Sequence, residues 1–283
     1  MATFTNFATL SYNGTTTNSN VVTGEILEAL SATKTALSES YEQNGKVTYI
    51  VTLTNTSALP LSTLTVTDDL GGYTFNGNTV YPLSFDEDSI RFFIDGVLQP
   101  TPLVVAGPPM VISGINIPAN SNAVIVYAAD VTAFAPLASA SQITNTVTVT
   151  GTSLTAPVTA QETVTAADSP ALSITKSLSP SVVTENGQIS YTFVIENSGN
   201  TAIVTTDDVI LTDTFNPILS DITVTYNGVV WTQGVNYTYN AATGEFATLP
   251  GQITVLGADF VQNADGTWTV NPASSAITVT GTI

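Results

Sequence analysis

Val47-Thr48-Tyr49-Ile50-Val51-Thr52-Leu53-Thr54 decides the fold, because apolar and mostly hydroxyl-bearing residues alternate along it. Ile143-Thr144-Asn145-Thr146-Val147-Thr148-Val149-Thr150 and Ala276-Ile277-Thr278-Val279-Thr280 follow the same rule. Alternation with a period of two sends one set of side chains into a core and the other into solvent, which is typical of half-buried β-strands. We therefore expect an all-β protein.

Hairpin turns punctuate these stretches. The dipeptides that a two-residue type I′ turn prefers occur at four places. They are Asn13-Gly14, Asp95-Gly96, Asn227-Gly228 and Asp265-Gly266. Short alternating strands joined by such turns predict two tandem immunoglobulin-like β-sandwiches, preceded by an N-terminal segment.

An internal repeat divides the chain. Leu30–Lys34 matches Leu172–Lys176, and the same offset aligns Asn44–Tyr49 with Asn186–Tyr191. The predicted domains follow from this repeat. They are residues 1–26 as an N-terminal donor segment, 27–168 as a complete repeat 1, and 169–283 as a repeat 2 that lacks its terminal strand or strands.

The two copies do not end alike. Repeat 1 continues into a strand at 142–150 and a second near 158–165, whereas repeat 2 reaches Ile283 before either. The missing pattern occurs at the other end of the chain. Phe4–Ser11 resembles Ile143–Thr150, and Asn20–Ile26 follows it as a candidate second strand.

A sandwich without a terminal strand exposes apolar side chains and unpaired backbone groups, which an extended segment from elsewhere can cover. Asn6 precedes Lys34 by nearly the same distance that separates Asn145 from Lys176. The N-terminal strand therefore belongs in a sandwich that precedes repeat 1, which is repeat 2 of another subunit. Such a head-to-tail contact builds a filament. The alternative is a frayed tail and a repeat 2 that is merely cut short.

Alternation also assigns each residue to a face. The inward face of the donor strand contains Phe4, Asn6, Ala8 and Leu10. Three polar residues share the apolar phase in each copy. They are Lys34, Asp68 and Asn145 in repeat 1, and Lys176 and Asp213 in repeat 2, with Asn6 arriving on the donor strand.

Burial favours the neutral forms of an amine and a carboxyl, and a neutral amine beside a carboxamide and a proton-shuttling acid can form an amide. We expect Asp68 and Asp213 to promote two Lys–Asn isopeptide bonds. One joins Lys34 to Asn145 within a chain, and the other joins Lys176 to Asn6 of a neighbour. The alternatives are a buried Lys–Asp pair hydrogen-bonded to Asn, or a lysine that extends to the surface.

Composition excludes many function classes. With 22 acidic and 4 basic residues and a net charge of −18, the chain is not built to neutralise nucleic-acid phosphates. It has no His and no Cys, which excludes thiol catalysis, His-based triads and zinc-finger sites. Asp86-Glu87-Asp88 is interpreted as a solvated loop rather than a calcium site. We expect no metal, no cofactor and no enzymatic activity beyond self-crosslinking.

The N-terminus lacks a basic and an apolar region of the kind that a secretory signal has, and no unbroken apolar stretch is long enough for a membrane span. We therefore expect neither membrane insertion nor a Sec-type signal peptide in this chain.

Several motifs together resemble a known family. They are Thr33-Lys34-Thr35, Val47-Thr48-Tyr49, Thr54-Asn55-Thr56, Val66-Thr67-Asp68-Asp69-Leu70 and Ile143–Val149. The set resembles a bacterial repeat of unknown function that recurs in tandem in surface proteins of Gram-positive bacteria. The resemblance implies immunoglobulin-like sandwiches in stalks or in cell-surface or spore-surface fibres, with Lys–Asn crosslinks.

The sequence thus predicts a structural subunit that polymerises with itself into an extracellular or spore-surface fibre, pilus-like in kind. The alternative is a fragment of a surface adhesin stalk that acts as a spacer or binding module.

Overall fold

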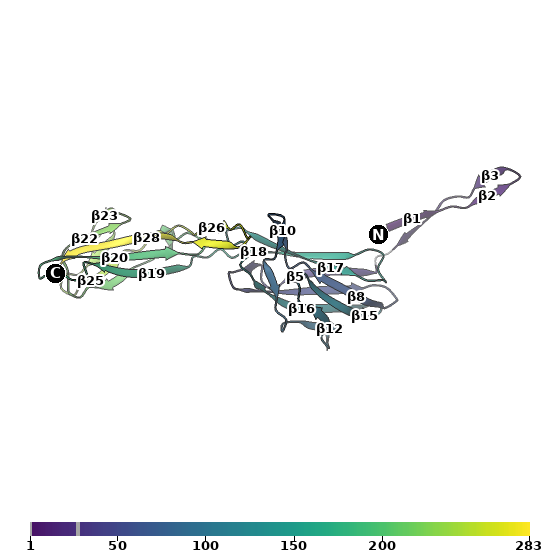
Figure 1. Cartoon of the computed structure of the whole chain (residues 1–283), viewed down its shortest axis with the longest axis horizontal. Coiled ribbons are helices and arrows are strands. Elements are labelled where there is room, and N and C mark those ends of the chain that lie inside the picture. The colour runs from purple at the N-terminus through teal and green to yellow at the C-terminus, as the bar shows by residue number, and fades with distance from the viewer. Residues whose placement is uncertain (1, 27–28) are drawn as a thin grey trace.

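A computed structural model describes residues 2–26 and 29–283. Figure 1 shows three parts along one long axis: an N-terminal arm (residues 2–26), a first sandwich and a second sandwich. The prediction of an all-β protein is confirmed, since the described residues form strands and one short 3₁₀ turn, η1 (Thr205–Asp207). Within those ranges there is no helix of the length and apolar character that crossing a bilayer requires.

The first sandwich consists of two facing six-stranded sheets. In the first sheet the order is β13 (Val97–Gln99), β12 (Arg91–Ile94), β16 (Ser121–Val131), β7 (Lys46–Asn55) and β5 (Leu30–Ala36), with β11 (Leu83–Phe85) also paired to β16. In the second the order is β14 (Leu103–Val105), β15 (Met110–Ile117), β8 (Leu61–Asp68), β17 (Gln142–Thr150), β18 (Val158–Ala166) and β6 (Ser40–Tyr41). A short hairpin, β9 (Tyr73–Phe75) with β10 (Asn78–Val80), lies beside them.

Alternation produces the core of this sandwich as expected. Along β7 the residues Val47, Tyr49, Val51 and Leu53 are at most 1% exposed, while the threonines between them are partly exposed. Their inward side chains meet those of the facing sheet in one continuous apolar cluster. Burial of this cluster is the main force that holds the two sheets together.

The second sandwich has one large sheet and one small one. The large sheet runs β19 (Leu172–Ser179), β20 (Gln188–Asn197), β28 (Ala273–Thr282), β22 (Ser220–Tyr226) and β23 (Val229–Trp231). The small sheet has only β21 (Thr212–Thr214), β25 (Glu245–Thr248) and β24 (Tyr237–Tyr239). A separate apolar cluster fills the space between them. The exact domain boundaries stay predictions, and residues 27 and 28 at the first boundary lie outside the described residues.

A hairpin from the second sandwich braces the first. It consists of β26 (Asp259–Gln262) and β27 (Trp268–Asn271). The Gln262 side chain donates to the Tyr73 hydroxyl at 2.8 Å, and the backbone N–H of Trp268 donates to the Ala133 carbonyl at 2.9 Å. Asn200 adds a second clasp, because its amide donates to the Leu137 and Ala167 carbonyls. Sequence analysis did not predict this junction.

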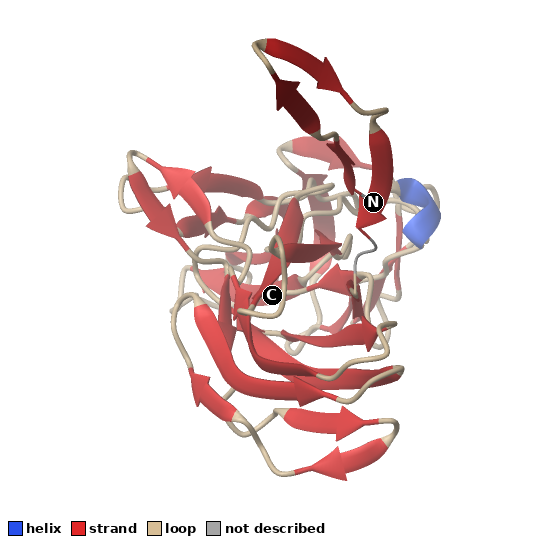
Figure 2. Cartoon of the chain, turned by 90° about the vertical axis from the view of Figure 1, so that its right-hand side faces the viewer, coloured by secondary structure: helices blue, strands red, loops and turns tan. Residues whose placement is uncertain are grey.

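The arm consists of two short ladders placed end to end. β1 (Ala2–Asn6) pairs with β4 (Val22–Ile26), and β2 (Thr9–Tyr12) pairs with β3 (Thr15–Asn18). Both ladders are antiparallel, so the arm is one long hairpin. Figure 1 shows it projecting away from the first sandwich, at the end of the molecule opposite the second, and Figure 2 shows the hairpin from that end.

Three of the four predicted type I′ turns are confirmed. At Asn13-Gly14, Asp95-Gly96 and Asn227-Gly228 both residues have a positive φ, as this turn requires. The fourth prediction is wrong. At Asp265-Gly266 only the glycine has a positive φ, because these residues lie in a five-residue loop between β26 and β27 rather than in a two-residue turn.

The repeated asparagines Asn55 and Asn197 have a structural role at equivalent places. The buried amide of Asn55 donates to the carbonyls of Leu59 and Pro118 at 2.9 and 2.8 Å. Asn197 likewise donates to Thr201 and Leu256, at 2.7 and 3.0 Å. Each side chain thereby fixes two loops at one end of its sandwich.

Removing either amide should destabilise its sandwich. We expect Asn55→Ala and Asn197→Ala each to lower the free energy of unfolding by roughly 2–3 kcal/mol, because several buried carbonyls lose their donor. Urea titration followed by tyrosine fluorescence measures the change. Asn78→Ala, at an exposed position, is the matched control and should have an effect near zero. A similar small effect at Asn55 would contradict the bracing role.

Candidate crosslinking site

A lysine and a carboxylate meet in the core of the first sandwich. Lys34 comes from β5 and Asp68 from the end of β8, and the Lys34 Nζ lies 2.6 Å from the Asp68 Oδ2. Both side chains have 0% exposure. Asp68 Oδ1 also accepts a hydrogen bond from the Leu70 N–H at 2.8 Å. The inward phase that sequence alternation assigned to both residues is the phase that they occupy.

Asn145 enters the same pocket from β17, the strand paired with β8. It is fully buried, and its amide nitrogen lies 3.5 Å from the Tyr127 hydroxyl. Tyr127 in turn donates to Asp68 Oδ2, so one phenol contacts both the acid and the amide. The Asn145 Oδ1 has no hydrogen-bond partner among the described residues. An unsatisfied buried carbonyl is costly, which marks this amide as unusual.

Two aromatic rings line the lysine. Its Nζ lies 4.6 Å from the centre of the Tyr49 ring and 5.7 Å from that of Tyr127. Burial lowers the pKa of Lys34, although nearby Asp68, Asp69 and Glu162 act in the opposite direction. Burial also raises the pKa of Tyr127 well above its usual value, so this phenol keeps its proton. The site therefore combines a lysine whose pKa is lowered, an acid and an amide, all buried from solvent.

The trio was predicted from the sequence, but the two tyrosines were not. Tyr49 on β7 and Tyr127 on β16 both point into the core. An aromatic residue at such a position is predicted to be an ordinary packing residue. Their cross-strand pairing, Tyr49 opposite Tyr127, is set by the register of those strands. The pairing places both rings beside Lys34, and the sequence carries no signal for that register.

The second sandwich contains the same pair in an open setting. Lys176 on β19 contacts Asp213 on β21, and its Nζ lies 4.7 Å from the Tyr191 ring centre. The lysine side chain is 41% exposed, against 0% for Lys34. No described residue of this sandwich takes the place that Asn145 has in the first. Val279, opposite Tyr191, stands where the first sandwich has Tyr127.

The difference in exposure accompanies a difference in strand pairing among the described residues. In the first sandwich β8 pairs with both β15 and β17, and β18 continues that sheet. In the second, β21 pairs with β25 only, and its other edge has no partner in the described part of the chain. The inner face of β19 is also uncovered, so Leu172, Ile174 and Leu178 are 42–52% exposed. The equivalent Leu30 is 2% exposed.

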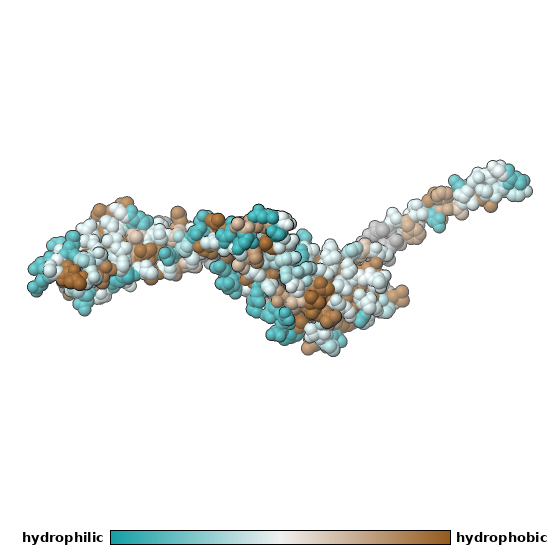
Figure 3. Space-filling view, viewed as in Figure 1, coloured by the Kyte–Doolittle hydropathy of each residue, from teal (hydrophilic) through white to brown (hydrophobic). Residues whose placement is uncertain are grey.

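The candidate donor residues lie far from this opening in the same molecule. Asn6 is on the arm, and Figure 1 places the arm and the second sandwich at opposite ends. Phe4 and Leu10 are 53% and 68% exposed, and Asn6 and Ala8 are exposed as well. Hydrophobic surface is visible along the middle of the arm in Figure 3. The structure therefore brings Lys34, Asp68 and Asn145 together but leaves Asn6 apart from Lys176 and Asp213.

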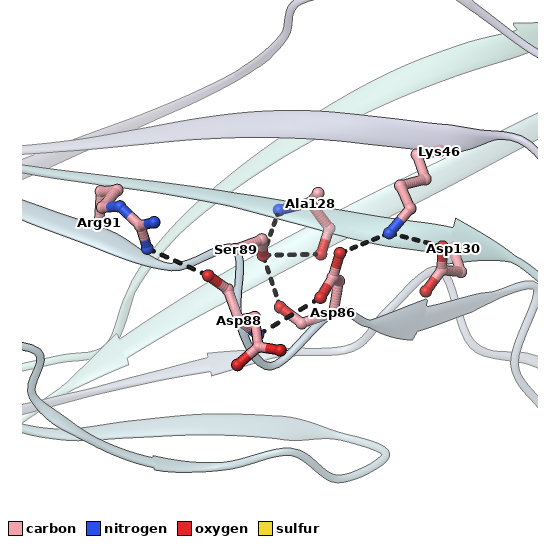
Figure 4. Close-up of polar contacts among 7 residues, drawn as sticks. All are labelled: Lys46, Asp86, Asp88, Ser89, Arg91, Ala128 and Asp130. Atoms are coloured by element: carbon pink, nitrogen blue, oxygen red, sulfur yellow. Dashed lines mark hydrogen bonds and ion pairs between the residues drawn. The ribbon is translucent and has the colours of Figure 1, made fainter.

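The acidic loop at Asp86-Glu87-Asp88 is held by protein groups. Lys46 bridges Asp86 and Asp130, and the Asp88 N–H donates to Asp86 Oδ1 (Figure 4). Arg91 donates to the carbonyls of Asp88 and Ile90. No group of acidic residues in the described ranges is arranged to hold a metal ion. The interpretation as a surface loop remains the simplest one.

Comparison with known proteins gives fold-level likeness only. No family model and no curated protein matches the sequence. Among solved structures, the major pilin BcpA of Bacillus cereus matches with a TM-score of 0.36 at 12% identity, over 96% of this chain and 73% of that one. The pilus backbone RrgB of Streptococcus pneumoniae matches at 0.35 and 10%, over 86% of this chain.

The collagen-binding domain of a Staphylococcus aureus adhesin matches at 0.32 and 13% identity, over 50% of this chain and 99% of that one. This chain spans only 55% of the length of RrgB. The similar structures thus include pilin and adhesin domains of Gram-positive bacteria, but TM-scores of this size carry no statement about function.

We expect the buried pair of Lys34 and Asp68 to affect stability. Asp68→Ala leaves a buried ammonium without its partner and should lower the free energy of unfolding by about 3–5 kcal/mol. The double variant Lys34→Met/Asp68→Asn removes both charges and should recover much of that loss. Both variants lack the Asp68 carboxyl group that promotes the isopeptide bond, so neither forms the bond. The difference between their free energies of unfolding therefore measures the cost of the unpaired buried charge. Urea titration measures it.

Asp213→Ala is the matched control, because it removes the same partner from an exposed lysine. It should change stability by less than about 1 kcal/mol, the range of surface ion pairs. Equal losses for Asp68→Ala and Asp213→Ala would contradict the assigned difference between the two sites.

Proposed function

We propose that this protein is the subunit of a surface fibre, of a cell or a spore, and that it polymerises head to tail by strand donation. The arm of one subunit completes the second sandwich of the next. The observation that carries this proposal is the contrast between the sealed pair Lys34–Asp68 and the open pair Lys176–Asp213.

The acceptor surface supports donation because it lacks what the first sandwich has. An unpaired edge at β21 and an uncovered face at β19 lie together around Lys176. Covering Leu172, Ile174 and Leu178 contributes roughly 1 kcal/mol or more for each side chain. Pairing along β21 adds backbone hydrogen bonds, which make such strand addition register-specific.

The donor supports it because its sequence matches the missing strand. Phe4–Ser11 aligns with Ile143–Thr150, which places Asn6 at the position of Asn145. Its apolar side chains are exposed in the free subunit, as an unpartnered donor requires. Because arm and acceptor lie at opposite ends of one elongated molecule, the contact joins different patches on two subunits (Figure 1). Repeated contacts of this kind extend into an open polymer.

The buried trio is arranged for amide exchange. Within the pair a proton passes from Lys34 Nζ to Asp68 Oδ2, and the neutral Nζ then attacks Cγ of Asn145 while Asp68 donates that proton to the carbonyl oxygen. Asp68 then takes a proton from the attacking amine and delivers it to Nδ2. The Cγ–Nδ2 bond breaks as the hydroxyl proton returns to Asp68, ammonia leaves, and an Nζ–Cγ amide bond remains. No oxidant, metal or water is consumed.

The same exchange in the second sandwich would link two subunits. Asp213 takes the role of Asp68, and Asn6 of the donor takes the role of Asn145. Few lysines could form this bond with Asn6 of the donor, because the chain has only Lys34, Lys46 and Lys176. Lys34 is sealed, and Lys46 is held at the surface by Asp86 and Asp130.

Deleting residues 2–26 should abolish polymerisation, because the variant has no donor. The truncated protein should run as a monomer in size-exclusion chromatography, with an unchanged first sandwich. It still offers an open second sandwich, so adding it to full-length protein in substoichiometric amounts should shorten the polymers. Light scattering and electron microscopy measure the lengths.

A synthetic peptide of residues 2–26 supplies the complementary control. It should occupy the acceptor and block growth, whereas a scrambled peptide of the same composition should not. Polymerisation of the truncated protein to the length of the full chain would disprove strand donation and leave the stalk or spacer alternative.

Asn6→Ala should convert covalent polymers into non-covalent ones. Boiled in detergent, wild-type polymers should give a ladder on electrophoresis, while Asn6→Ala polymers should collapse to monomer. Asn20→Ala, an exposed asparagine on the same arm, is the matched control and should keep the ladder. For the internal bond, intact mass should fall short of the sequence mass by one ammonia, and Asn145→Ala should remove that deficit.

The two bonds are tested separately by these readouts. If boiled wild-type polymers run as monomers on electrophoresis, the bond between Asn6 and Lys176 is excluded. Strand donation itself is not contradicted by that result. A monomer at its full sequence mass would exclude the bond between Lys34 and Asn145.

A further inference from the structure

We propose that the arm is donated as a preformed two-stranded hairpin, so that β4 enters the neighbour together with β1 and β2. This inference rests on the proposed function and goes beyond it, since completing β21 requires only one strand. It identifies the partner surface as the β21 edge and the face of β19 together.

The first reason is the face that must be covered. In the first sandwich β18, more than β17, is the strand that packs against β5. Val164 and Ala166 of β18 belong to the buried core. A single donated strand in the place of β17 would pair with β21 and leave the inner face of β19 largely uncovered. Only a second strand in the place of β18 covers it.

The second reason is register. In the arm Asn6 lies opposite Val22, and Thr5 lies opposite Thr23. In the first sandwich Asn145 lies opposite Glu162, and Thr144 lies opposite Thr163. The alignment that equates Asn6 with Asn145 therefore also equates β4 with β18, one pair at a time. Between β1 and β4 the free arm already has the pairing that the completed sandwich needs, whereas its outer ladder, with Thr9 opposite Asn18, is one residue out of that register.

The third reason is that the hairpin presents one shared face. Residues directly opposite each other in an antiparallel ladder lie on the same side of it. Asn6 and Val22 thus share a face with Phe4 and Gly24. The Phe4 ring lies over Gly24, where an added Cβ would come within 2.4 Å of it. Asn6 is therefore displayed beside apolar groups, on the side that would meet Lys176.

The hairpin also changes the chemistry of the joined site. Glu162 lies near Lys34 in the first sandwich and favours its charged form. The arm carries Val22 at the equivalent position. Hairpin donation would therefore close the site around Lys176 with an apolar side chain in place of a carboxylate.

A disulfide lock tests the inference. Thr5 and Thr23 are paired and exposed, and the hydroxyls of their counterparts Thr144 and Thr163 lie 2.8 Å apart. Paired residues in an antiparallel ladder have the Cα separation that a disulfide spans. The chain has no cysteine, so Thr5→Cys/Thr23→Cys forms one defined bond. The two single variants control for the substitutions themselves.

Hairpin donation predicts that the oxidised double variant polymerises as well as the reduced one, within about twofold in rate. Single-strand donation requires β1 to leave β4, which the disulfide prevents. Polymerisation that occurs only after reduction would therefore overturn the inference while leaving strand donation intact. Failure of the wild-type chain to polymerise would instead overturn the proposed function.

Hydrogen exchange of wild-type polymers provides a reading without substitutions. An isolated two-stranded ladder is marginally stable, so the amides of residues 20–26 should exchange rapidly in the free subunit. In the polymer they should become protected by at least tenfold, together with those of residues 4–11. Protection confined to residues 4–11 would overturn hairpin donation.

Discussion

A β-sandwich is stable only when both faces of its core are covered and its inner strand edges are paired. The first sandwich meets this requirement within its own sequence, and its central lysine and carboxylate are sealed from water as a result. The second has an equivalent lysine, carboxylate and flanking ring, but its described residues include no counterpart of β17 or β18. The two otherwise similar units therefore differ in how far solvent reaches the lysine and its carboxylate.

The polar groups at the two sites show how environment sets their chemistry. Lys34 lies against the rings of Tyr49 and Tyr127 and contacts Asp68, and burial lowers its pKa. Lys176 has the same kind of carboxylate contact at a surface that solvent reaches. Covering the second site with a donated arm would therefore remove Lys176 from solvent without a change in the sequence around it.

Much of this arrangement was predictable from the sequence, and the reasons are physical. Alternation fixes the face of each residue, so Lys34, Asp68 and Asn145 could be placed inward before any coordinates. The internal repeat carried the same assignment to Lys176 and Asp213. The roles of Tyr127 and of the pairing between β1 and β4 were not predictable, because both depend on strand register. The loop at Asp265-Gly266 was misjudged because a turn dipeptide does not fix the length of the turn.

The brace between the sandwiches has a mechanical consequence. β26–β27 and Asn200 tie the second sandwich to the first within each chain. Only three residues separate β15 from β16 in the first sandwich, so no comparable hairpin reaches out from there. In a head-to-tail polymer the junction inside each subunit would therefore contain this brace, and the junction between subunits would lack it. Such a fibre would behave as a chain of stiff two-domain rods that bends at every second joint.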